Sequence, residues 1–486
     1  MSTKAATVPL SWLDQAFVLL ERQRQPFHVA YLGLLSPAAG MSTCAAVDQL
    51  LAHLRDGGPP RPPFDRRLGL SGGRMAWIPD PSFSLDRHLL RLHLPSPGRM
   101  DDLMGLVSRL HGVPMERSAP PWRMYVIEGL RDGRFALYAK LHHALADGVA
   151  GTRLLLRSFS PDPLAHPAPP WALGCASTPT ARAAQKSDDK REGWLTRLAA
   201  TGVVLGELHR TARDVARRPA EVVGGRDGPA SLLNRRIGSA RSLSVRSLSL
   251  ARVRVVAQVL GGTTNDVVLA LCAGALRRFL IERDALPDTS LVAMVPMSTR
   301  GEGDDALGNR IVPLLVRLGT DIDDPIERFA LIRRSAGHSK DRFVGLSTGE
   351  SYAYALASSG RGLMQLLLRP EAGRIPFNIV ISNLRGPATP QYWHGLRLEG
   401  LFPMSVVLDG QALNLTFTSR EDRLDFGLTA CRRTVPGAGR VLEYLETSLE
   451  ELEACLPAHE LSRSRPPAAE IPAEAAPPRR VQSPRT

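Results

Sequence analysis

The sequence predicts a mixed α/β protein of two domains. At 486 residues the chain is longer than one hydrophobic core usually supports. Short apolar runs typical of β-strands are interspersed with segments of helical periodicity, which predicts a mixture of both elements. A stretch rich in proline and small polar residues, 161–190, separates two such parts and is expected to be a flexible linker.

The first domain is expected to span residues 1–160. It opens with a helix that Ser11 can cap, because apolar residues then recur at helical spacing. Residues 123–128 and 134–141 have the pattern of two strands joined by a tight turn, which predicts a β-hairpin near its end.

The second predicted strand leads directly into His142-His143-Ala144-Leu145-Ala146-Asp147-Gly148, so the two histidines fall at a strand end or turn. A neutral imidazole with a pKa of about 6.5 can take a proton from an alcohol near neutral pH. Asp147 is placed to orient the turn, and Gly148 to let it close. The same residues are also compatible with a buried structural histidine pair or with half of a metal site.

Residues 191–245 are predicted to contain a basic amphipathic helix and a crossover. From Trp194 onward, apolar residues form one stripe while most arginines lie elsewhere on the helix. Such a helix either packs on the body with a solvated basic face or docks on a membrane surface.

The second domain is expected over residues 246–456, followed by a disordered tail at 457–486. Asn265 and Asp266 have the position of helix-capping residues before an apolar helical run. The remaining predicted elements are strands at 291–296, 311–318 and 377–382, a hairpin of 413–418 with 424–429, and helices at 325–339 and 437–455.

The charge balance predicts an anionic partner, because 61 Lys and Arg residues outnumber 48 Asp and Glu residues to give a net charge of +13. A nucleic acid, an acidic membrane surface and a phosphorylated cofactor all fit this charge. Aromatic residues make up only 5% and are not interleaved with basic clusters, which argues against nucleic acid.

The five cysteines are scattered without a CxxC pair, so neither a disulfide framework nor a zinc site is indicated and a reducing compartment is expected. No apolar run of about 18 residues is present, so any membrane contact is expected to be peripheral.

Taken together, these pieces resemble the bacterial bifunctional wax ester synthase/acyl-CoA:diacylglycerol acyltransferase family, from Pro9 to about Cys455. The residues that carry the resemblance are Pro9 to Asp14, Pro120-Pro121-Trp122, Ile127 to Leu130, Leu141 to Gly151, Asn265-Asp266-Val267, Val295 to Arg300, Gly308-Asn309 and Asn378 to Pro387. Family members often have Pro-Leu-Trp at the second of these motifs and Val-Pro in place of Leu384-Arg385, which concerns the substrate channel. A wider resemblance is to acyltransferases built like chloramphenicol acetyltransferase and to peptide-synthetase condensation domains.

The resemblance implies two chloramphenicol-acetyltransferase-like lobes with a tunnel between them that holds the HHxxxDG motif. It places the catalytic histidine at His143, the structural aspartate at Asp147 and the active-site asparagine at Asn265. His142 is then a supporting residue, Arg300 the expected ion-pair partner of Asp147, and no metal is expected. The residues expected to contribute to binding are Asn378, Ser382, Asn383 and Gly386.

The implied reaction is transfer of an acyl group from acyl-CoA, a co-substrate rather than a cofactor, to diacylglycerol or a long-chain alcohol. The sequence shows no nucleophile elbow and no cysteine beside a histidine, which favours direct transfer over a covalent acyl-enzyme. The enzyme is expected to be cytoplasmic and to associate peripherally with an anionic membrane or lipid-droplet surface. Two alternatives remain open: a condensation-type enzyme that uses a carrier-protein thioester, and a non-catalytic lipid-binding paralogue.

Overall fold

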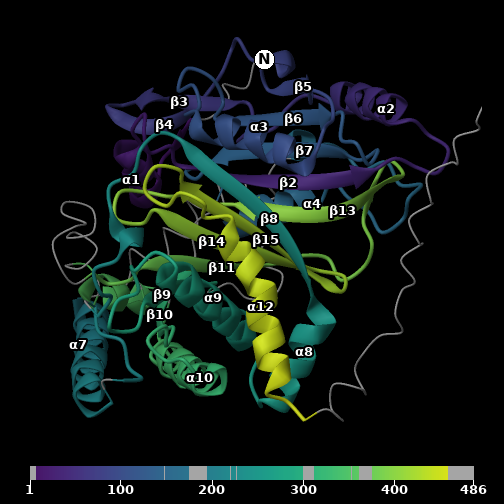
Figure 1. Ribbon diagram of the computed structural model, residues 1–486. Helices are drawn as coiled ribbons and strands as arrows, with labels where there is room; N and C mark the ends of the chain where they lie inside the picture. Colours follow the sequence, from purple (N-terminus) through teal and green to yellow (C-terminus); the bar gives the residue numbers. More distant parts are fainter. Residues whose placement is uncertain are drawn as a thin grey trace, which may run out of the picture.

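Two lobes, each built on a six-stranded mixed sheet, make up the protein (Figure 1). The computed structural model describes residues 7–146, 148–173, 194–218, 220–225, 227–298, 311–347, 349–351, 353–358, 360 and 375–457. A small three-stranded sheet of β1 (Val8–Pro9), β4 (Arg74–Pro79) and β3 (Arg66–Ser71) adds to the N-terminal lobe. The predicted mixed α/β class is confirmed.

The N-terminal sheet has the strand order β12-β13-β2-β7-β6-β5. Its strands are β2 (His28–Ser36), β5 (Leu89–His93), β6 (Trp122–Glu128), β7 (Phe135–His142), β12 (Tyr392–Trp393) and β13 (Leu396–Met404), and its longer helices are α2 (Thr43–Asp56) and α3 (Met100–Gly112). The predicted hairpin is the antiparallel pair of β6 and β7. Every residue of β7 is buried, because Leu137 and Ala139 pack into one hydrophobic cluster and Ala136 and Tyr138 into another on the opposite face.

The C-terminal sheet has the order β10-β9-β11-β14-β15-β8. Its strands are β8 (Arg241–Ser249), β9 (Val292–Ser298), β10 (Ile311–Arg317), β11 (Ile379–Arg385), β14 (Leu413–Arg420) and β15 (Arg423–Cys431). The helices of this lobe are α8 (Leu250–Val259), α9 (Thr264–Ile281), α10 (Pro325–Asp341) and α12 (Arg440–Ala454). The middle helix, α9, is buried along most of its length in the largest hydrophobic cluster. Thr263 caps it, and Asp266 completes the capping box by accepting from the Thr263 N–H, so Asp266 has the capping role expected of it.

One strand crosses from the second half of the chain into the sheet of the first half. Strand β13 follows β11 in the sequence, but it pairs antiparallel with β2 over most of its length, with a bulge between Leu398 and Gly400. The segment 246–456, predicted to form the C-terminal lobe, therefore contributes β12 and β13 to the other lobe (Figure 1). The exchange ties the second half of the chain to the N-terminal sheet through main-chain hydrogen bonds on both sides of the bulge.

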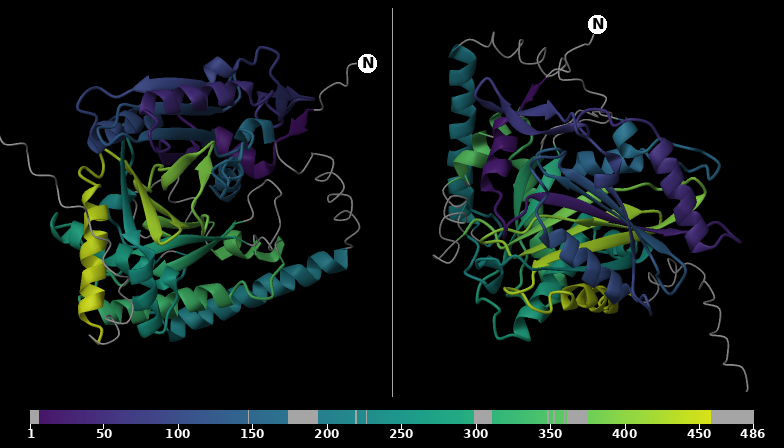
Figure 2. Two further views of the ribbon diagram at one scale, coloured as in Figure 1. Left: turned by 90° about the vertical axis from the view of Figure 1, so that its right-hand side faces the viewer. Right: turned by 90° about the horizontal axis from the view of Figure 1, so that it is seen from above.

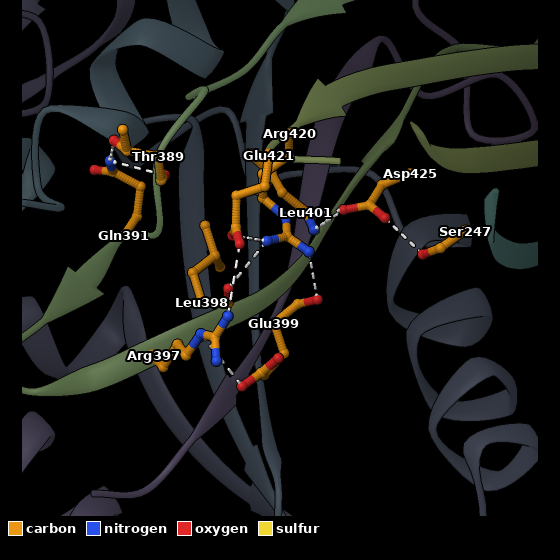
Figure 3. Close-up of polar contacts among 10 residues, drawn as sticks. All are labelled: Ser247, Thr389, Gln391, Arg397, Leu398, Glu399, Leu401, Arg420, Glu421 and Asp425. Carbon is orange, nitrogen blue, oxygen red and sulfur yellow. Dashed lines mark hydrogen bonds and ion pairs between the residues drawn. The ribbon is translucent and has the colours of Figure 1, made fainter. Parts of the chain in front are cut away.

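A buried ion pair holds β13 against the C-terminal sheet (Figure 3). Asp425 on β15 is fully buried, and one of its oxygens accepts the main-chain N–H of Leu401 at 2.9 Å and Arg420 Nε at 3.2 Å. Its other oxygen accepts the Ser247 hydroxyl of β8 at 2.5 Å. Arg420 Nη2 in turn donates to the Glu399 carbonyl in the bulge at 2.6 Å. The pair thus satisfies main-chain groups of β13 that the bulge leaves outside the regular ladder.

The described part of the predicted linker is packed against the N-terminal lobe. Helix α4 (Gly148–Leu156) ends the first lobe, and the short helix α5 (Pro170–Leu173) follows the proline-rich residues. Trp171 is 1% exposed, and its ring stacks on Trp122 at a centroid distance of 5.3 Å. The expected flexibility does not fit residues 169–171, which are buried, because burial of this large aromatic ring holds the chain there. For the remaining residues of the stretch it stays a prediction. Residues 174–190 and the tail from 458 lie outside the described residues.

The predicted basic helix is α7 (Trp194–Arg217), which lies along the outer flank of the C-terminal lobe (Figure 2). No single helix in the described part of the chain is long and apolar enough to span a membrane. Only α8 and α9 taken together reach that length and composition, with a bend of 103° between them.

We expect Asp425→Ala to lower the free energy of unfolding by about 1.5–3 kcal/mol, because it removes a buried carboxylate that accepts from the Leu401 N–H and from Arg420, and leaves Arg420 with Glu421 as its carboxylate partner. Arg397→Gln is the control. Its side chain is 47% exposed and its ion pair with Glu421 is at the surface, so the loss should stay below about 1 kcal/mol. Equal losses in chemical denaturation would contradict the anchoring role of Asp425.

Candidate active site

The two histidines of the motif are placed by main-chain hydrogen bonds at the end of β7. His142 N–H donates to the Pro121 carbonyl at 2.9 Å, and His143 N–H donates to the Phe27 carbonyl at 2.8 Å. Leu145 N–H then donates back to the His142 carbonyl at 2.8 Å, which closes the turn before α4. Consecutive residues at a strand end point to opposite sides, so the two imidazoles reach different surroundings.

His143 lines a cavity of about 390 Å³ between the two lobes. Its half-buried ring packs against Phe17 of α1 (Trp12–Leu20), with centroids 4.6 Å apart and planes at 59°. The lining residues from the N-terminal half are Phe17, Phe27, Val29, Ala30, Tyr31, His143, Gly148 and Val149. Those from the second half are Met294, Pro296, Pro313, Val380, Ser382, Asn383, Leu384, Pro403, Met404, Ser405, Val406, Leu408, Gln411, Asn414 and Thr416.

The cavity combines an apolar side with a polar wall. Phe17, Phe27 and Val29 come from the N-terminal half, whereas Asn414 and Thr416 come from β14 in the middle of the C-terminal sheet. The Thr416 hydroxyl donates to Asn414 Oδ1 at 2.8 Å, which assigns that atom as the acceptor and leaves the amide NH₂ as the donor end of Asn414. A mostly apolar cavity with a few convergent polar groups is typical of a site for a lipid-like substrate.

His142 points away from this cavity towards Glu21 at the end of α1. Its Nδ1 accepts the Ala144 N–H at 3.1 Å, so in the neutral imidazole the proton is on Nε2, which lies 3.5 Å from Glu21 Oε1. Burial alone would raise the pKa of Glu21. The hydrogen bond and charge of His142, the Phe27 N–H and the charge of Arg117 outweigh that effect and lower its pKa below the ordinary 4.5. Glu21 is therefore an anion that holds both His142 and the backbone next to His143.

Gly148 begins α4, and its carbonyl accepts the hydroxyls of Tyr31 at 2.6 Å and Thr152 at 2.7 Å. A Cβ at Gly148 would be in ordinary contact with Leu384, so the backbone does not demand glycine there. The close approach is one turn later, because a Cβ at Gly151 would lie 2.7 Å from the Tyr31 hydroxyl.

Two of the residues expected to contribute to binding, Ser382 and Asn383, line the cavity from β11. Asn378 does not line it in the described part of the chain. Its Oδ1 accepts the Val292 N–H at 2.9 Å, and its Nδ2 donates to the Pro229 carbonyl and to Asn234. These hydrogen bonds give the Asn378 side chain a structural role.

Gly386 also lies outside the cavity lining among the residues that the structure describes. Its N–H donates to the Ser419 carbonyl at 2.9 Å, and a Cβ there would lie 2.5 Å from that oxygen. The glycine is required for the close approach of β11 to β14.

Asn265, the expected active-site asparagine, lies half-buried in the first turn of α9. It is not among the described residues that line the cavity, and its predicted role stays a prediction. Asp147 and its expected partner Arg300 lie outside the described residues. No group of three or more His, Cys, Asp or Glu side chains suited to a metal ion occurs in the described ranges.

Comparison with known proteins identifies the family. The wax ester synthase/diacylglycerol acyltransferase catalytic domain matches residues 10–268, and the C-terminal domain of the same family matches residues 307–453. The O-acyltransferase WSD of Acinetobacter baylyi is 38% identical over 454 residues, which are 92% of this chain and 97% of that protein. The chain belongs to the wax ester synthase/diacylglycerol acyltransferase family. The predicted resemblance is thereby confirmed.

Further relatives agree. A putative diacylglycerol O-acyltransferase of Mycobacterium tuberculosis is 40% identical over 456 residues, which are 91% of this chain and 99% of that protein. The solved wax ester synthase/diacylglycerol acyltransferase of Marinobacter aquaeolei is 35% identical, covers 92% of this chain and 99% of its own, and has a TM-score of 0.72. The first condensation domain of the calcium-dependent antibiotic synthetase is 15% identical, covers 93% of this chain and 96% of its own with a TM-score of 0.59, and so shares the fold. The predicted two-lobed architecture is confirmed.

We expect Glu21→Gln to lower the free energy of unfolding at pH 7 by about 1.5–3 kcal/mol, because it removes a buried charge that accepts hydrogen bonds. Since the pKa of Glu21 is lowered in the folded protein, its contribution is present above pH 4.5 and is lost as the pH falls through the folded value. Denaturation curves of wild type and variant should therefore converge in acid. A difference that is constant with pH would contradict this assignment.

Proposed function

We propose that this chain transfers the acyl group of acyl-CoA directly to the hydroxyl of diacylglycerol or a long-chain alcohol, with His143 as general base. Membership of the family makes the chain an O-acyltransferase that forms wax esters or triacylglycerol. The observation that carries the residue assignment is that His143, and not His142, lines the cavity between the lobes.

The reaction requires two groups near the reacting carbonyl: a base for the acceptor hydroxyl and a hydrogen-bond donor for the carbonyl oxygen. His143 takes the proton of the acceptor hydroxyl as its oxygen attacks the thioester carbon. The carbon–sulfur bond then breaks, and the CoA thiolate takes that proton back from His143, which restores the neutral base. The negative oxygen of the tetrahedral intermediate needs a hydrogen-bond donor. We assign that role to the polar wall, where the Asn414 amide is oriented by Thr416. Asn265 is a second candidate for this donor, and only its place in the family motif supports it.

The two alternative functions differ in their products. A condensation-type enzyme has the same fold, but it takes its acyl group from a carrier-protein thioester and gives no free CoA from acyl-CoA. A non-catalytic paralogue binds lipid and releases nothing. The combination of His143 with the polar wall supports retained chemistry.

We expect wild-type protein mixed with palmitoyl-CoA and either dioleoylglycerol or hexadecanol to release free CoA and form the corresponding neutral lipid. His143→Ala should lower kcat by a factor of about 10² to 10⁴ with unchanged melting, because it removes the base from a turn held by main-chain bonds. His142→Ala is the matched control next to it, and it should lose stability, since Glu21 loses a partner, while keeping more activity. An inactive His142 variant beside an active His143 variant would overturn the assignment.

We also propose that α7 brings the enzyme to anionic lipid surfaces, because its substrates are nearly insoluble in water. Arg213 and Arg217 are exposed on the outer flank, and Val203 and Leu205 expose apolar surface on the same helix. Each arginine near an anionic bilayer contributes about 1 kcal/mol, and an apolar stripe can bury beside the basic residues.

We expect changing four arginines of α7 to glutamine to weaken co-sedimentation with anionic vesicles at low salt; the four are Arg210, Arg213, Arg217 and Arg218. The control removes four charges of the same sign elsewhere on the surface, at Arg74, Arg131, Arg235 and Arg236. High salt should weaken wild-type binding as well, because these charges are screened. If both variants bind as wild type does, α7 is only a packed helix with a solvated basic face.

A further inference from the structure

A second cavity, of about 430 Å³, lies between α7 and the edge of the C-terminal sheet. Leu208 and Val215 of α7 form one side, and Phe343 after α10 and Ala355 form the other. Pro313 and Leu315 of the edge strand β10 form its floor. His143 does not contribute to it, so this outer cavity is distinct from the catalytic cavity.

The outer cavity and the catalytic cavity adjoin on one face of the same sheet. In the β9–β10 ladder Pro313 is opposite Pro296, and Leu315 is opposite Met294, so all four side chains share one face. Met294 and Pro296 line the catalytic cavity, Leu315 lines the outer cavity, and Pro313 lines both. Pro313 therefore marks the junction between the two spaces.

Several polar groups on the wall of the outer cavity form hydrogen bonds within the protein. The hydroxyls of Thr211 and Tyr354 are 2.7 Å apart and form a hydrogen bond. Ser339 Oγ accepts the Leu315 N–H at 3.1 Å, and Arg342 Nη1 donates to the Val223 carbonyl at 3.1 Å. The cavity thus offers mainly apolar surface, and its volume is in the range of small-molecule sites.

Three segments that line the outer cavity also carry apolar side chains that are exposed at the protein surface. Val344 is 76% exposed directly after Phe343, and Leu356 is 67% exposed directly after Ala355. Leu205, 60% exposed, lies one helical turn from Leu208 of α7. Exposed apolar surface on segments that line a cavity is typical of a region that contacts a lipid or a protein partner.

We propose that the outer cavity holds an alkyl chain of the acceptor, namely one acyl chain of diacylglycerol. The inference rests on the proposed function. Diacylglycerol brings two chains to a reaction in which the donor brings a third, whereas a fatty alcohol brings only one. The catalytic cavity of about 390 Å³ must also hold the thioester and the hydroxyl, so an adjoining apolar space serves the acceptor with the extra chain.

The test fills the outer cavity and compares acceptors. Ala355→Trp places an indole in the cavity, and Ala353→Trp is the matched control, because Ala353 belongs to the same helical segment but is exposed and does not line the cavity. With palmitoyl-CoA as donor, Ala355→Trp should lower kcat/KM for dioleoylglycerol at least about tenfold, while kcat/KM for hexadecanol stays within twofold of the control. Ala212→Trp, which fills the cavity from α7, should act in the same way if the first variant folds poorly.

Three outcomes overturn the proposal. Equal kinetics of the Ala355 and Ala353 variants with dioleoylglycerol mean that the outer cavity takes no part. Equal losses with both acceptors, accompanied by a preference for shorter acyl-CoA, assign the cavity to the donor chain instead. A wild-type enzyme that esterifies neither acceptor contradicts the proposed function itself, and this result is distinguishable because it does not depend on any variant.

Discussion

The buried carboxylate of Asp425 holds the sheets of the two lobes in position relative to each other. It is fully buried, and it joins the main chain of β13, the side chain of β8 and the guanidinium of Arg420 at the end of β14. Strand β13 is hydrogen-bonded to β2 in the other lobe, so these few bonds fix one sheet relative to the other. A buried pair of this kind adds little net stability compared with an apolar contact, but removing Asp425 leaves the Leu401 N–H without its acceptor and Arg420 with Glu421 as its carboxylate partner.

Because the two sheets are held in position, a cavity with an apolar side and a polar wall lies between the lobes. Pro403 and Met404, at the end of β13, line it together with Asn414 of the neighbouring sheet. On the opposite wall His143 is fixed by its own N–H to the Phe27 carbonyl, while Glu21 accepts the Phe27 N–H. The backbone that carries His143 is therefore held by Phe27 and, through it, by Glu21, while the His143 ring packs against Phe17. The polar wall is oriented by contacts within the C-terminal sheet.

The elements whose signals are local could be predicted from the sequence. The β6–β7 hairpin alternates clearly, and the histidine motif follows it directly, so the position of His143 at a strand end could be read from the chain. Ser382 and Asn383 were found through a motif of the family. The exchange of β13 could not be predicted, because nothing local to residues 396–404 distinguishes pairing with β2 from pairing within the C-terminal sheet.

Single residues contributed by distant elements were missed for a similar reason. Glu21 and Asn414 have no neighbouring motif, and their roles arise only where the fold brings them against His142 and Thr416. Conversely, Gly386 and Asn378 were expected to bind substrate, but packing and main-chain hydrogen bonds account for them. The proline-rich stretch indicated flexibility, whereas burial of Trp171 holds residues 169–171 in place. A sequence motif therefore indicates which residues the fold or the reaction needs, but it does not show whether a given residue binds substrate or only holds the backbone in place.

In the proposed reaction the acyl group passes directly between two substrates that occupy the same cavity, with no covalent intermediate on the protein. Intact-protein mass spectrometry tests it most directly: wild-type enzyme is mixed with palmitoyl-CoA alone, quenched at short times, and then mixed with hexadecanol. The account predicts an unchanged protein mass and no burst of free CoA until the alcohol is added. A palmitoyl adduct that forms without acceptor and disappears when hexadecanol is added would contradict it.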